Sequence, residues 1–316
     1  MLLGSCFAEN IGERLEKFRF PVDINPFGTL YNPGSIAAAL SRLLDNKPFT
    51  RNDIFKEGNL WHSFLHHSRF SHTDADTCLQ HINARFSAAA ESLRKTDLLI
   101  LTRGTAWVYI ENESGKIVAN CHKLPASRFT RRRLSVEEML QEWTPLLSRL
   151  FAVNPDIKLL LTVSPIRHLK DGTHGNRLSK AALLLFCDEL MQRYPDRCHY
   201  FPAYEIVLDE LRDYRFYDTD MVHPSAQAIE YVWERFSETF FDKETIALHR
   251  EWEALSRASQ HRPLTPDKEA YRRFVEQHIL RLEDFHKKYP DFSVAEELAA
   301  ARRIIEKSDS DEIPYK

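Results

Sequence analysis

Two short stretches of the chain hold residue types that could carry out nucleophilic catalysis. The first is Gly4-Ser5-Cys6, which lies between an apolar start and a helix-forming run. A small residue lets the backbone turn sharply from strand to helix, and the helix N-terminus favours negative charge, so Ser5 or Cys6 could be exposed there as a nucleophile. A helix start in which Ser5 only caps and Cys6 only packs would need the same residues.

The second stretch, residues 220–224, places a histidine three residues after an aspartate. The carboxylate of Asp220 can orient the ring of His223, and the other ring nitrogen is then free to act as a general base. A surface aspartate with a capping role explains the pair equally well. The position in the chain carries the argument, because the pair follows the last predicted strand of an alternation whose first strand ends at Gly4.

Periodicity in the rest of the chain predicts the scaffold for these residues. Asp97–Thr102 and Ile157–Val163 are continuous apolar runs, the pattern of buried parallel strands. Val22–Ile24 and Cys198–Phe201 are further strand candidates. Helical spacing predicts helices over residues 7–18, 33–43, 75–93, 135–150, 178–191 and 225–240. We therefore expect an α/β fold with a parallel sheet of about five strands, helices on both faces, and functional residues at the carboxyl ends of the strands.

Other segments stand apart from this alternation. Residues 45–74 read as an irregular insertion, and residues 107–110 with 116–119 as a hairpin. Near residue 244 the composition shifts to long charged helices. We therefore predict two parts, a domain over residues 1–243 and a helical extension over residues 244–316.

Composition excludes several classes of protein. The 316 residues carry 43 Lys and Arg against 46 Asp and Glu, so no basic excess indicates a nucleic-acid partner. The apolar runs are far too short to span a bilayer. Five cysteines without a CxxC pair indicate a reducing compartment and no disulfide framework, and we expect a cytoplasmic protein. A strand into Gly4 needs about five residues, so we expect the native chain to begin upstream of Met1.

Two runs invite a ligand-binding interpretation. Residues 61–72 contain four histidines, but there is no HExxH spacing, no cysteine partner and no carboxylate between them. We expect this segment to line a pocket, and we predict no metal. The run Thr130–Arg133 carries three arginines and reads as a solvated face, with binding of an anionic substrate as the alternative.

The stretch Gly4-Ser5-Cys6-Phe7-Ala8 is the motif that gives the GSCFA family its name, and the chain resembles this family from Met1 to about Phe241. That family resembles a distant branch of the SGNH, or GDSL-type, hydrolases, which are serine esterases and acyl-hydrolases. The link rests on Gly4, on Gly28 in the loop after the second strand, and on the Asp220–His223 pair. It implies a flavodoxin-like, three-layer parallel sheet, with the C-terminal helices as an appendage.

The chain departs from the SGNH pattern at the nucleophile. That pattern begins Gly-Asp-Ser, and an ungapped match places Ser5 on the aspartate and Cys6 on the nucleophilic serine. We favour Cys6, because it needs no shift of register and because His223 and a helix N-terminus would both favour a thiolate. Ser5 is the alternative if the turn is re-registered.

The second departure concerns the oxyanion hole. SGNH enzymes carry Gly-x-Asn after the third strand, whereas this chain reads Gly104-Thr105-Ala106-Trp107. If the predicted hairpin turns near Glu113-Ser114, it returns Asn120 opposite Trp107 or Val108, beside that strand end. Asn120 is therefore the candidate side-chain donor, with the backbone N–H of Gly28 as a second. A turn or ladder role would explain Asn120 as well.

These residues together predict an esterase or acyl-transfer enzyme that acts on a small-molecule or glycan ester and needs no cofactor. Cys6 or Ser5 attacks, His223 moves the proton, and Asp220 orients His223. The alternative is a non-catalytic binding protein on the same fold, which the missing Gly-x-Asn and the unusual nucleophile would suit. We expect neither a nucleic acid nor a membrane as a partner.

Overall fold

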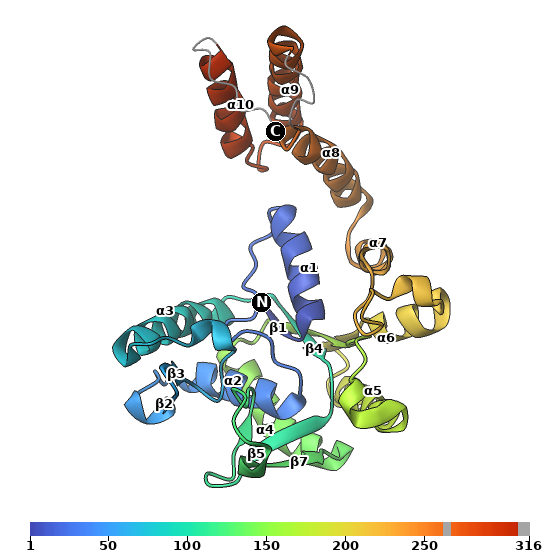
Figure 1. Cartoon of the computed structure of the whole chain (residues 1–316). Coiled ribbons are helices and arrows are strands. Elements are labelled where there is room, and N and C mark those ends of the chain that lie inside the picture. The colour runs from blue at the N-terminus through green and yellow to red at the C-terminus, as the bar shows by residue number, and fades with distance from the viewer. Residues whose placement is uncertain (262–266, 309–316) are drawn as a thin grey trace. The chain divides into compact units, whose positions relative to one another are not determined.

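The computed structural model describes residues 1–261 and 267–308 (Figure 1). The chain divides into two compact units between Glu234 and Arg235, inside helix α7 (Ala226–Phe240). The division expected from the sequence, at residues 243/244, lies at the start of helix α8 (Lys243–Ser259). Each unit is described by itself below. Within the described ranges, no helix is both long and apolar enough to cross a bilayer.

A four-stranded parallel sheet forms the centre of the N-terminal unit, in the order β1-β4-β8-β9. Its strands are β1 (Leu2–Gly4), β4 (Leu98–Arg103), β8 (Lys158–Val163) and β9 (Cys198–Tyr200). The register places Gly4 opposite Thr102 and Arg103 opposite Val163. The carboxyl ends of β1, β4 and β8 therefore meet at one edge of the sheet, as the alternation of strands and helices predicted.

The expected fifth strand, Val22–Ile24, is reduced to a single bridge. Ile24 pairs in parallel with Leu2, on the side of β1 away from β4. Pairing stops there because Asn25 has a positive φ of 42° and turns the chain away, and the next residue is Pro26, which has no N–H to donate.

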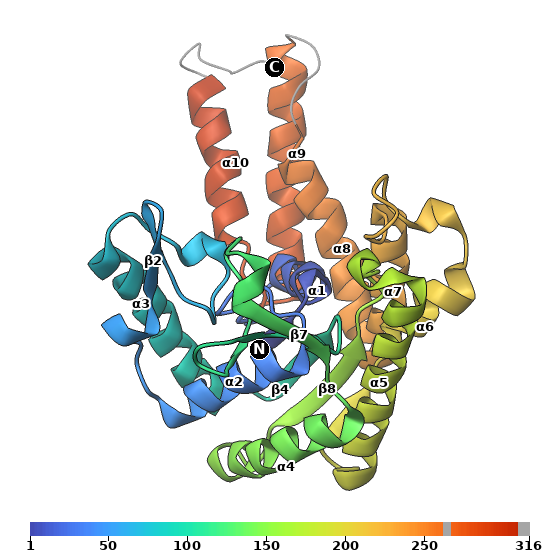
Figure 2. The same cartoon turned by 60° about the horizontal axis from the view of Figure 1, so that its bottom comes forward.

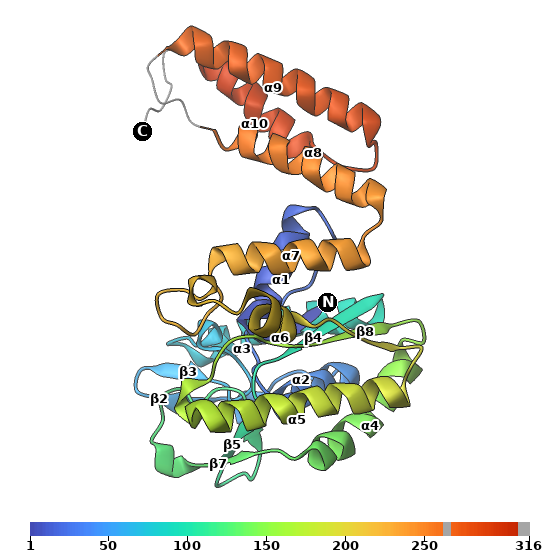
Figure 3. The ribbon, with the colours of Figure 1, turned by 90° about the vertical axis from the view of Figure 1, so that its right-hand side faces the viewer.

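Helices cover both faces of the sheet, as expected. Leu3, Leu101 and Leu161 belong to the core cluster that α2 to α5 share, while α1 packs on the opposite face against β1 and β4. Figure 3 shows α1 and α7 on one side of the sheet and α2, α4 and α5 on the other. The helices of this unit are α1 (Cys6–Lys17), α2 (Pro33–Asp45), α3 (Ala75–Arg94), α4 (Val136–Val153), α5 (Gly172–Arg193), the short α6 (Ala203–Glu205) and the first part of α7.

Side-chain caps fix where these helices begin. Asn32 accepts a hydrogen bond from the backbone N of Ser35, and Pro33 follows as the first residue of α2. Ser135 and Glu138 form the capping box that starts α4. The cap at Asn32 therefore marks the end of the loop that follows Ile24 and the start of helix α2.

One cation is buried in the sheet itself. Arg103, the last residue of β4, is 0% exposed, and its guanidinium lies over the rings of Trp143 at 4.6 Å and Phe186 at 4.9 Å. It also donates to Sγ of Cys187 at 3.7 Å. No carboxylate among the described residues pairs with it, so aromatic faces and one sulfur hold this charge.

A second, antiparallel sheet has the order β6-β5-β7, and Figure 2 brings it forward. Its strands are β5 (Trp107–Glu111), β6 (Ile117–Val118) and β7 (Phe129–Arg133). Tyr109 pairs with Val118, which confirms the predicted hairpin and its turn. The run Thr130–Arg133 pairs with β5, and Thr130 and Arg133 are exposed, as the expectation of a solvated face requires. Arg131 departs from it, because its guanidinium lies over the ring of Trp107 at 4.4 Å.

The insertion over residues 45–74 is also more regular than expected. It contains a small hairpin, β2 (Phe55–Glu57) with β3 (Leu60–His62), and Gly58 in its turn has a positive φ of 56°. Three residues per strand are too few for the alternation of polar and apolar positions to be recognised in the sequence.

The C-terminal unit is helical, as predicted. Besides α8 it contains α9 (Lys268–Lys288) and α10 (Ala295–Ser308), and α9 packs against both neighbours. Trp252 on α8 and Phe285 on α9 are buried between the helices, with ring centroids 5.8 Å apart.

At Gly4, β1 approaches β4 so closely that only a residue without a side chain fits. Its φ is +151°, and a Cβ there would lie 2.1 Å from the backbone O of Thr102. We expect Gly4→Ala to lower the free energy of unfolding by about 3 kcal/mol, because β1 must move away from β4. Chemical denaturation measures this loss.

Gly58→Ala is the matched control. Gly58 also has a positive φ, but nothing lies within 4 Å of its Cβ position. The loss there should stay near 1 kcal/mol, the cost of the backbone conformation alone. Equal losses in the two variants would contradict the close approach of β1 to β4.

Candidate functional site

The turn between β1 and α1 separates the roles of its two candidate nucleophiles. Ser5 is 0% exposed and caps α1, with its Oγ accepting a hydrogen bond from N of Phe7 at 3.3 Å. Its backbone N donates to O of Thr102 at 3.2 Å. Cys6 is the first residue of the helix and is partly exposed. The cap occupies the hydroxyl of Ser5, and the thiol of Cys6 lies at the helix N-terminus.

The loop after Ile24 is fastened to this turn. Asn25 accepts a hydrogen bond from N of Gly4 through Oδ1 at 2.9 Å, and N of Leu30 donates to O of Gly4 at 2.8 Å. Gly28 has a positive φ of 83°, and its N–H donates to O of Asn25 at 2.8 Å. The backbone donor predicted for the oxyanion hole thus lies in the loop beside Gly4 and has a partner within that loop.

Tyr31, at the end of this loop, connects Cys6 with the turn after β4. Its hydroxyl lies 3.6 Å from Sγ of Cys6, and its backbone O accepts from N of Gly104 at 2.8 Å and from N of Thr105 at 2.9 Å. Burial raises the pKa of Tyr31 to about 12, so the phenol keeps its proton at physiological pH. The sequence predicts this loop but no role for Tyr31. The feature that could have indicated one is an aromatic side chain between Gly28 and the start of α2.

Two neighbouring residues of α5 bind the backbone of the turn after β4, which begins at Gly104. Oγ of Ser179 accepts from N of Ala106 at 2.7 Å. Nζ of Lys180 donates to O of Gly104 at 2.5 Å and to O of Ser164 at 2.6 Å. Lys180 is 1% exposed, and burial lowers its pKa to about 7. No sequence motif singled it out.

His168 lies in the loop after β8 and packs on this turn. Its ring meets the ring of Tyr31 edge to face, with centroids 6.1 Å apart, and its Nε2 is 3.0 Å from the point where a Cβ on Gly104 would lie. Burial lowers the pKa of His168 to about 4, helped by the charges of Lys180 and Arg131. The ring is therefore neutral near pH 7. Its buried Nε2 forms no hydrogen bond of normal geometry among the described residues, although the backbone of Gly104 lies close enough to act against the lowering of its pKa.

The predicted Asp–His pair is formed. Nδ1 of His223 lies 2.5 Å from Oδ2 of Asp220, and each side chain is 47% exposed. Oδ1 of Asp220 also accepts from the backbone N of His223 at 3.0 Å and of Val222 at 2.8 Å. Hydrogen bonds from His223, first from its backbone and then from its ring, lower the pKa of Asp220 to about 2. The carboxylate is ionised and orients the ring.

The loop after β8 also contacts the loop of His223. The backbone N of Arg167 donates to O of Val222 at 3.3 Å, and its guanidinium lies 3.8 Å from the centroid of the ring of Tyr217. His223 is close enough to His168 to lower its pKa further. The segment with Arg167 and His168 thus contacts Tyr31, the neighbour of Cys6, and the loop of the Asp–His pair.

Asn120 contacts the insertion of residues 45–74. Its Nδ2 donates to Oγ of Ser68 at 3.1 Å, and its backbone N donates to O of Phe64 at 3.2 Å. The predicted register would place it opposite Trp107, but β6 ends at Val118. Pairing with β5 ends there because the backbone N–H groups of Ala119 and Asn120 both donate to O of Phe64.

The histidines of the insertion bind protein groups. Nδ1 of His66 lies 2.9 Å from Oγ of Ser63, and Nε2 of His122 lies 2.8 Å from O of the same residue. The rings of His62 and His122 have centroids 4.4 Å apart. Within residues 1–261 and 267–308, no group of three His, Cys, Asp or Glu side chains is placed to hold a metal ion.

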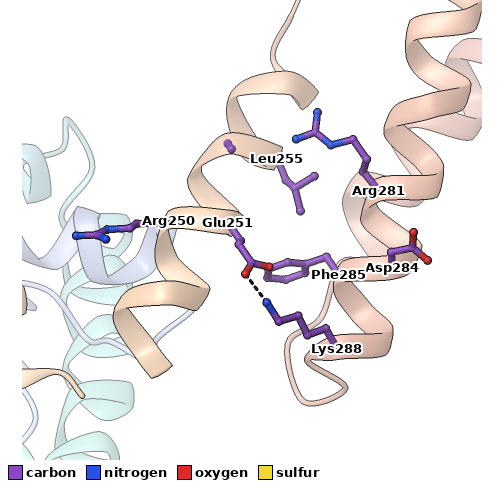
Figure 4. Close-up of a pocket in the computed structure, with 8 residues that line it drawn as sticks. Arg250, Glu251, Leu255, Arg281, Asp284, Phe285 and Lys288 are labelled. Carbon is purple, nitrogen blue, oxygen red and sulfur yellow. Dashed lines mark hydrogen bonds and ion pairs between the residues drawn. The ribbon is translucent and has the colours of Figure 1, made fainter. Parts of the chain in front are cut away.

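A cavity of about 500 Å³ lies in the C-terminal unit (Figure 4). Its lining residues are Arg250, Glu251, Ala254, Leu255, Arg281, Asp284, Phe285 and Lys288. They come from α8 and α9 alone, with Lys288 paired to Glu251 across the opening. None of the candidate site residues described above lines it.

Buried His66 makes stability depend on pH. Burial lowers its pKa to about 3, so the folded protein holds the ring neutral while the unfolded chain takes up a proton below about pH 6.5. Its contribution is complete above pH 6.5 and is lost as the pH falls. We expect unfolding at pH 5 to cost about 2 kcal/mol less than at pH 7 through this residue.

Chemical denaturation of His66→Asn at the two pH values measures this, since the amide can keep the hydrogen bond to Ser63 without titrating. The difference between pH 7 and pH 5 should shrink in this variant and stay unchanged in His174→Asn, which replaces an exposed histidine. An unchanged difference in His66→Asn would contradict the assignment.

Comparison with known proteins identifies the family. Residues 1–236 match the model of the GSCFA family, and residues 252–307 match the model described as the C-terminal domain of GSCFA domain proteins. Neither a curated protein nor a solved structure matches the chain. The first match covers more than half of the chain and includes the turn with Cys6 and the Asp220–His223 pair, so the protein belongs to the GSCFA family.

Proposed function

We propose that the protein is a carboxylic-ester hydrolase or acyl-transfer enzyme in which Cys6 is the nucleophile, His223 the general base and Asp220 its orienting carboxylate. The observation that carries this proposal is the division of roles at the turn: Cys6 is partly exposed against the hydroxyl of Tyr31, while Ser5 is buried and committed to the cap. We therefore favour the thiol of Cys6 over the hydroxyl of Ser5 as the nucleophile.

The strand order supports a flavodoxin-like, SGNH-type fold. If the bridge at Ile24 counts as the second strand, the spatial order of the sheet is 2-1-3-4-5. In sheets of this order ligands bind between the carboxyl ends of the first and third strands, where the order reverses. Those strands are β1 and β4, and they end at the turns of Gly4 and Gly104.

The proposed reaction follows from the roles of these groups. Sγ of Cys6 attacks the carbonyl carbon of an ester while His223 accepts the thiol proton. The tetrahedral intermediate expels an alkoxide, which takes the proton from His223 and leaves a thioester on Cys6. Water or an acceptor hydroxyl then attacks the thioester while His223 accepts its proton, and His223 passes this proton to the departing thiolate of Cys6, which releases the acid or the new ester. No cofactor is needed, and the ester can be a small molecule or a glycan.

The helix N-terminus supplies a donor for the oxyanion. The backbone N–H of Cys6 is the first of α1, and no acceptor for it occurs in the described part of the chain. The protonated hydroxyl of Tyr31 is a second donor beside the same sulfur. Gly28 and Asn120 remain proposed donors, although the N–H of Gly28 would first have to leave O of Asn25, and one of the two amide N–H groups of Asn120 binds Ser68.

The partners of Gly28 and Asn120 also favour the alternative function, a non-catalytic binding protein on the same fold. A binding protein has no need of an oxyanion hole, so both donors could keep their hydrogen bonds permanently. The two functions differ in whether Cys6 is required for turnover.

Alkylation and turnover decide the role of Cys6. Burial raises the pKa of the thiols of Cys78, Cys121, Cys187 and Cys198. We therefore expect iodoacetamide to modify Cys6 before the others. Cys6→Ala should abolish turnover of an aryl acetate, while Ser5→Ala should keep a measurable part and lose about 1 kcal/mol of stability with the cap.

Cys121→Ala, which removes the other partly exposed thiol, serves as the control and should turn over normally. Activity that survives in Cys6→Ala but not in Ser5→Ala would assign the hydroxyl. No turnover by the wild-type protein, with no preferential alkylation, would favour the binding protein.

Tyr31→Phe tests the second donor. Removing a hydroxyl that faces the reacting sulfur should lower kcat by about 10- to 100-fold and change stability by about 1 kcal/mol or less. Tyr109→Phe is the control, because it removes a hydroxyl that binds Lys170 at 2.5 Å outside the site. Equal turnover by the two variants would exclude Tyr31 as a donor.

A further inference from the structure

A buried lysine lies beneath the candidate site and takes no part in the chemistry proposed above. The ammonium group of Lys180 binds the carbonyls of Gly104 and Ser164, the residues at which the chain leaves β4 and β8. Taking an ammonium group out of water is costly unless hydrogen bonds or counter-ions compensate. A methylene-rich apolar residue would fill this place at lower cost, so the charge and its donors indicate a specific role.

We propose that Lys180 is a positioning residue of the candidate active site: it ties the Gly104 turn to the loop after β8, and its charge adds to burial in opposing protonation of the His168 ring. Only its effect on turnover rests on the proposed function. The tie and the electrostatic effect are properties of the folded chain and can be measured without a substrate.

The tie completes the hydrogen bonds of the turn. Tyr31 accepts from the two N–H groups of Gly104 and Thr105, Ser179 accepts from N of Ala106, and Lys180 donates to O of Gly104. The turn is thus held by the loop beside Cys6 from one direction and by α5 from the other. An ammonium group has three N–H donors and a neutral amine two, so either form can serve both carbonyls.

The electrostatic effect follows from the groups around His168. After burial, Lys180 is the largest influence that lowers the pKa of His168, followed by Arg131. The carboxylate of Asp171 binds Arg131, and its charge partly offsets the effect of burial on the pKa of Lys180. The other groups that face the pair are Tyr204, whose ring centroid is 5.8 Å from Nζ of Lys180, and His223.

A neutral His168 keeps the neighbourhood of Cys6 in one arrangement. Its Nε2 faces Gly104 without a hydrogen bond of normal geometry, and its ring packs on Tyr31. The backbone of Gly104, the acceptor beside the ring, already binds Lys180, and a protonated ring would repel that ammonium group. The packing that holds Tyr31 against Cys6 therefore depends on the absence of that proton.

The test compares ring titrations in the full-length protein labelled with ¹³C,¹⁵N-histidine. In Lys180→Met we expect the titration of His168 to move to higher pH by about one unit. Ser179→Ala removes the other tie of α5 but keeps the charge, so His168 should titrate as in the wild type. In Lys158→Met, which removes a lysine bound to O of Asp196 at the amino end of β8, it should also be unchanged.

An unchanged titration of His168 in folded Lys180→Met, or an equal shift in Ser179→Ala, would overturn the proposal. Turnover separates it from the proposed function. Because Lys180→Met also removes the tie to Gly104 and Ser164, kcat for an aryl acetate should fall about 10- to 100-fold at a similar KM. A shift with no turnover in the wild type would overturn the ester chemistry alone, and turnover without a shift would overturn the role of Lys180 alone.

The wild-type protein provides a second measurement if Lys180→Met fails to fold. In protein labelled with ¹⁵N-lysine, Nζ of Lys180 should titrate near pH 7 and exchange its hydrogens slowly, because the group is buried and bonded to two carbonyls. A Lys180 signal that titrates and exchanges together with the exposed lysines would overturn the proposal.

Discussion

The close approach of β1 to β4 at Gly4 is the constraint on which the candidate site depends. A carbonyl oxygen of β4 occupies the space that a side chain on Gly4 would need, and the same oxygen accepts the N–H of Ser5. Helix α1 starts directly after this contact, so the position of its first residue, Cys6, is fixed relative to β4. The loop of Tyr31 is then fastened to both strand ends through backbone hydrogen bonds.

Much of the fold could be predicted because its signals are local. Continuous apolar runs identify β4 and β8, helical spacing and caps identify α2 to α5, and the predicted hairpin register agrees with the pairing of Tyr109 and Val118. The small strands β2, β3 and β7 were missed, because three to five residues with polar or aromatic side chains give no clear period. Strand β7 is stabilised by partners far away in the sequence, which no window of sequence contains.

The candidate site also contains residues that short motifs predict and residues that only the folded structure brings together. The turn at Cys6 and the Asp220–His223 pair were predicted from short motifs, and the pair has the expected hydrogen bond. Tyr31, His168 and Lys180 were not predicted, because each acts through contacts that form only when the carboxyl ends of β1, β4 and β8 meet. Asn120 was placed by extending a ladder, and the chain leaves that ladder two residues earlier. Their roles in catalysis stay predictions.

The buried arginine of β4 places a positive charge inside the sheet edge. Arg103 has no carboxylate partner among the described residues, and its aromatic neighbours screen it far less than water would. Lys180, when protonated, adds a second buried cation beside Gly104, and Asp171 is already bound to Arg131, so these two cations contribute a positive potential at this edge in a chain whose net charge is −3. Low-dielectric walls focus such a potential outward. In the reaction proposed above, an oxyanion formed at this edge would interact with buried cations that it does not touch.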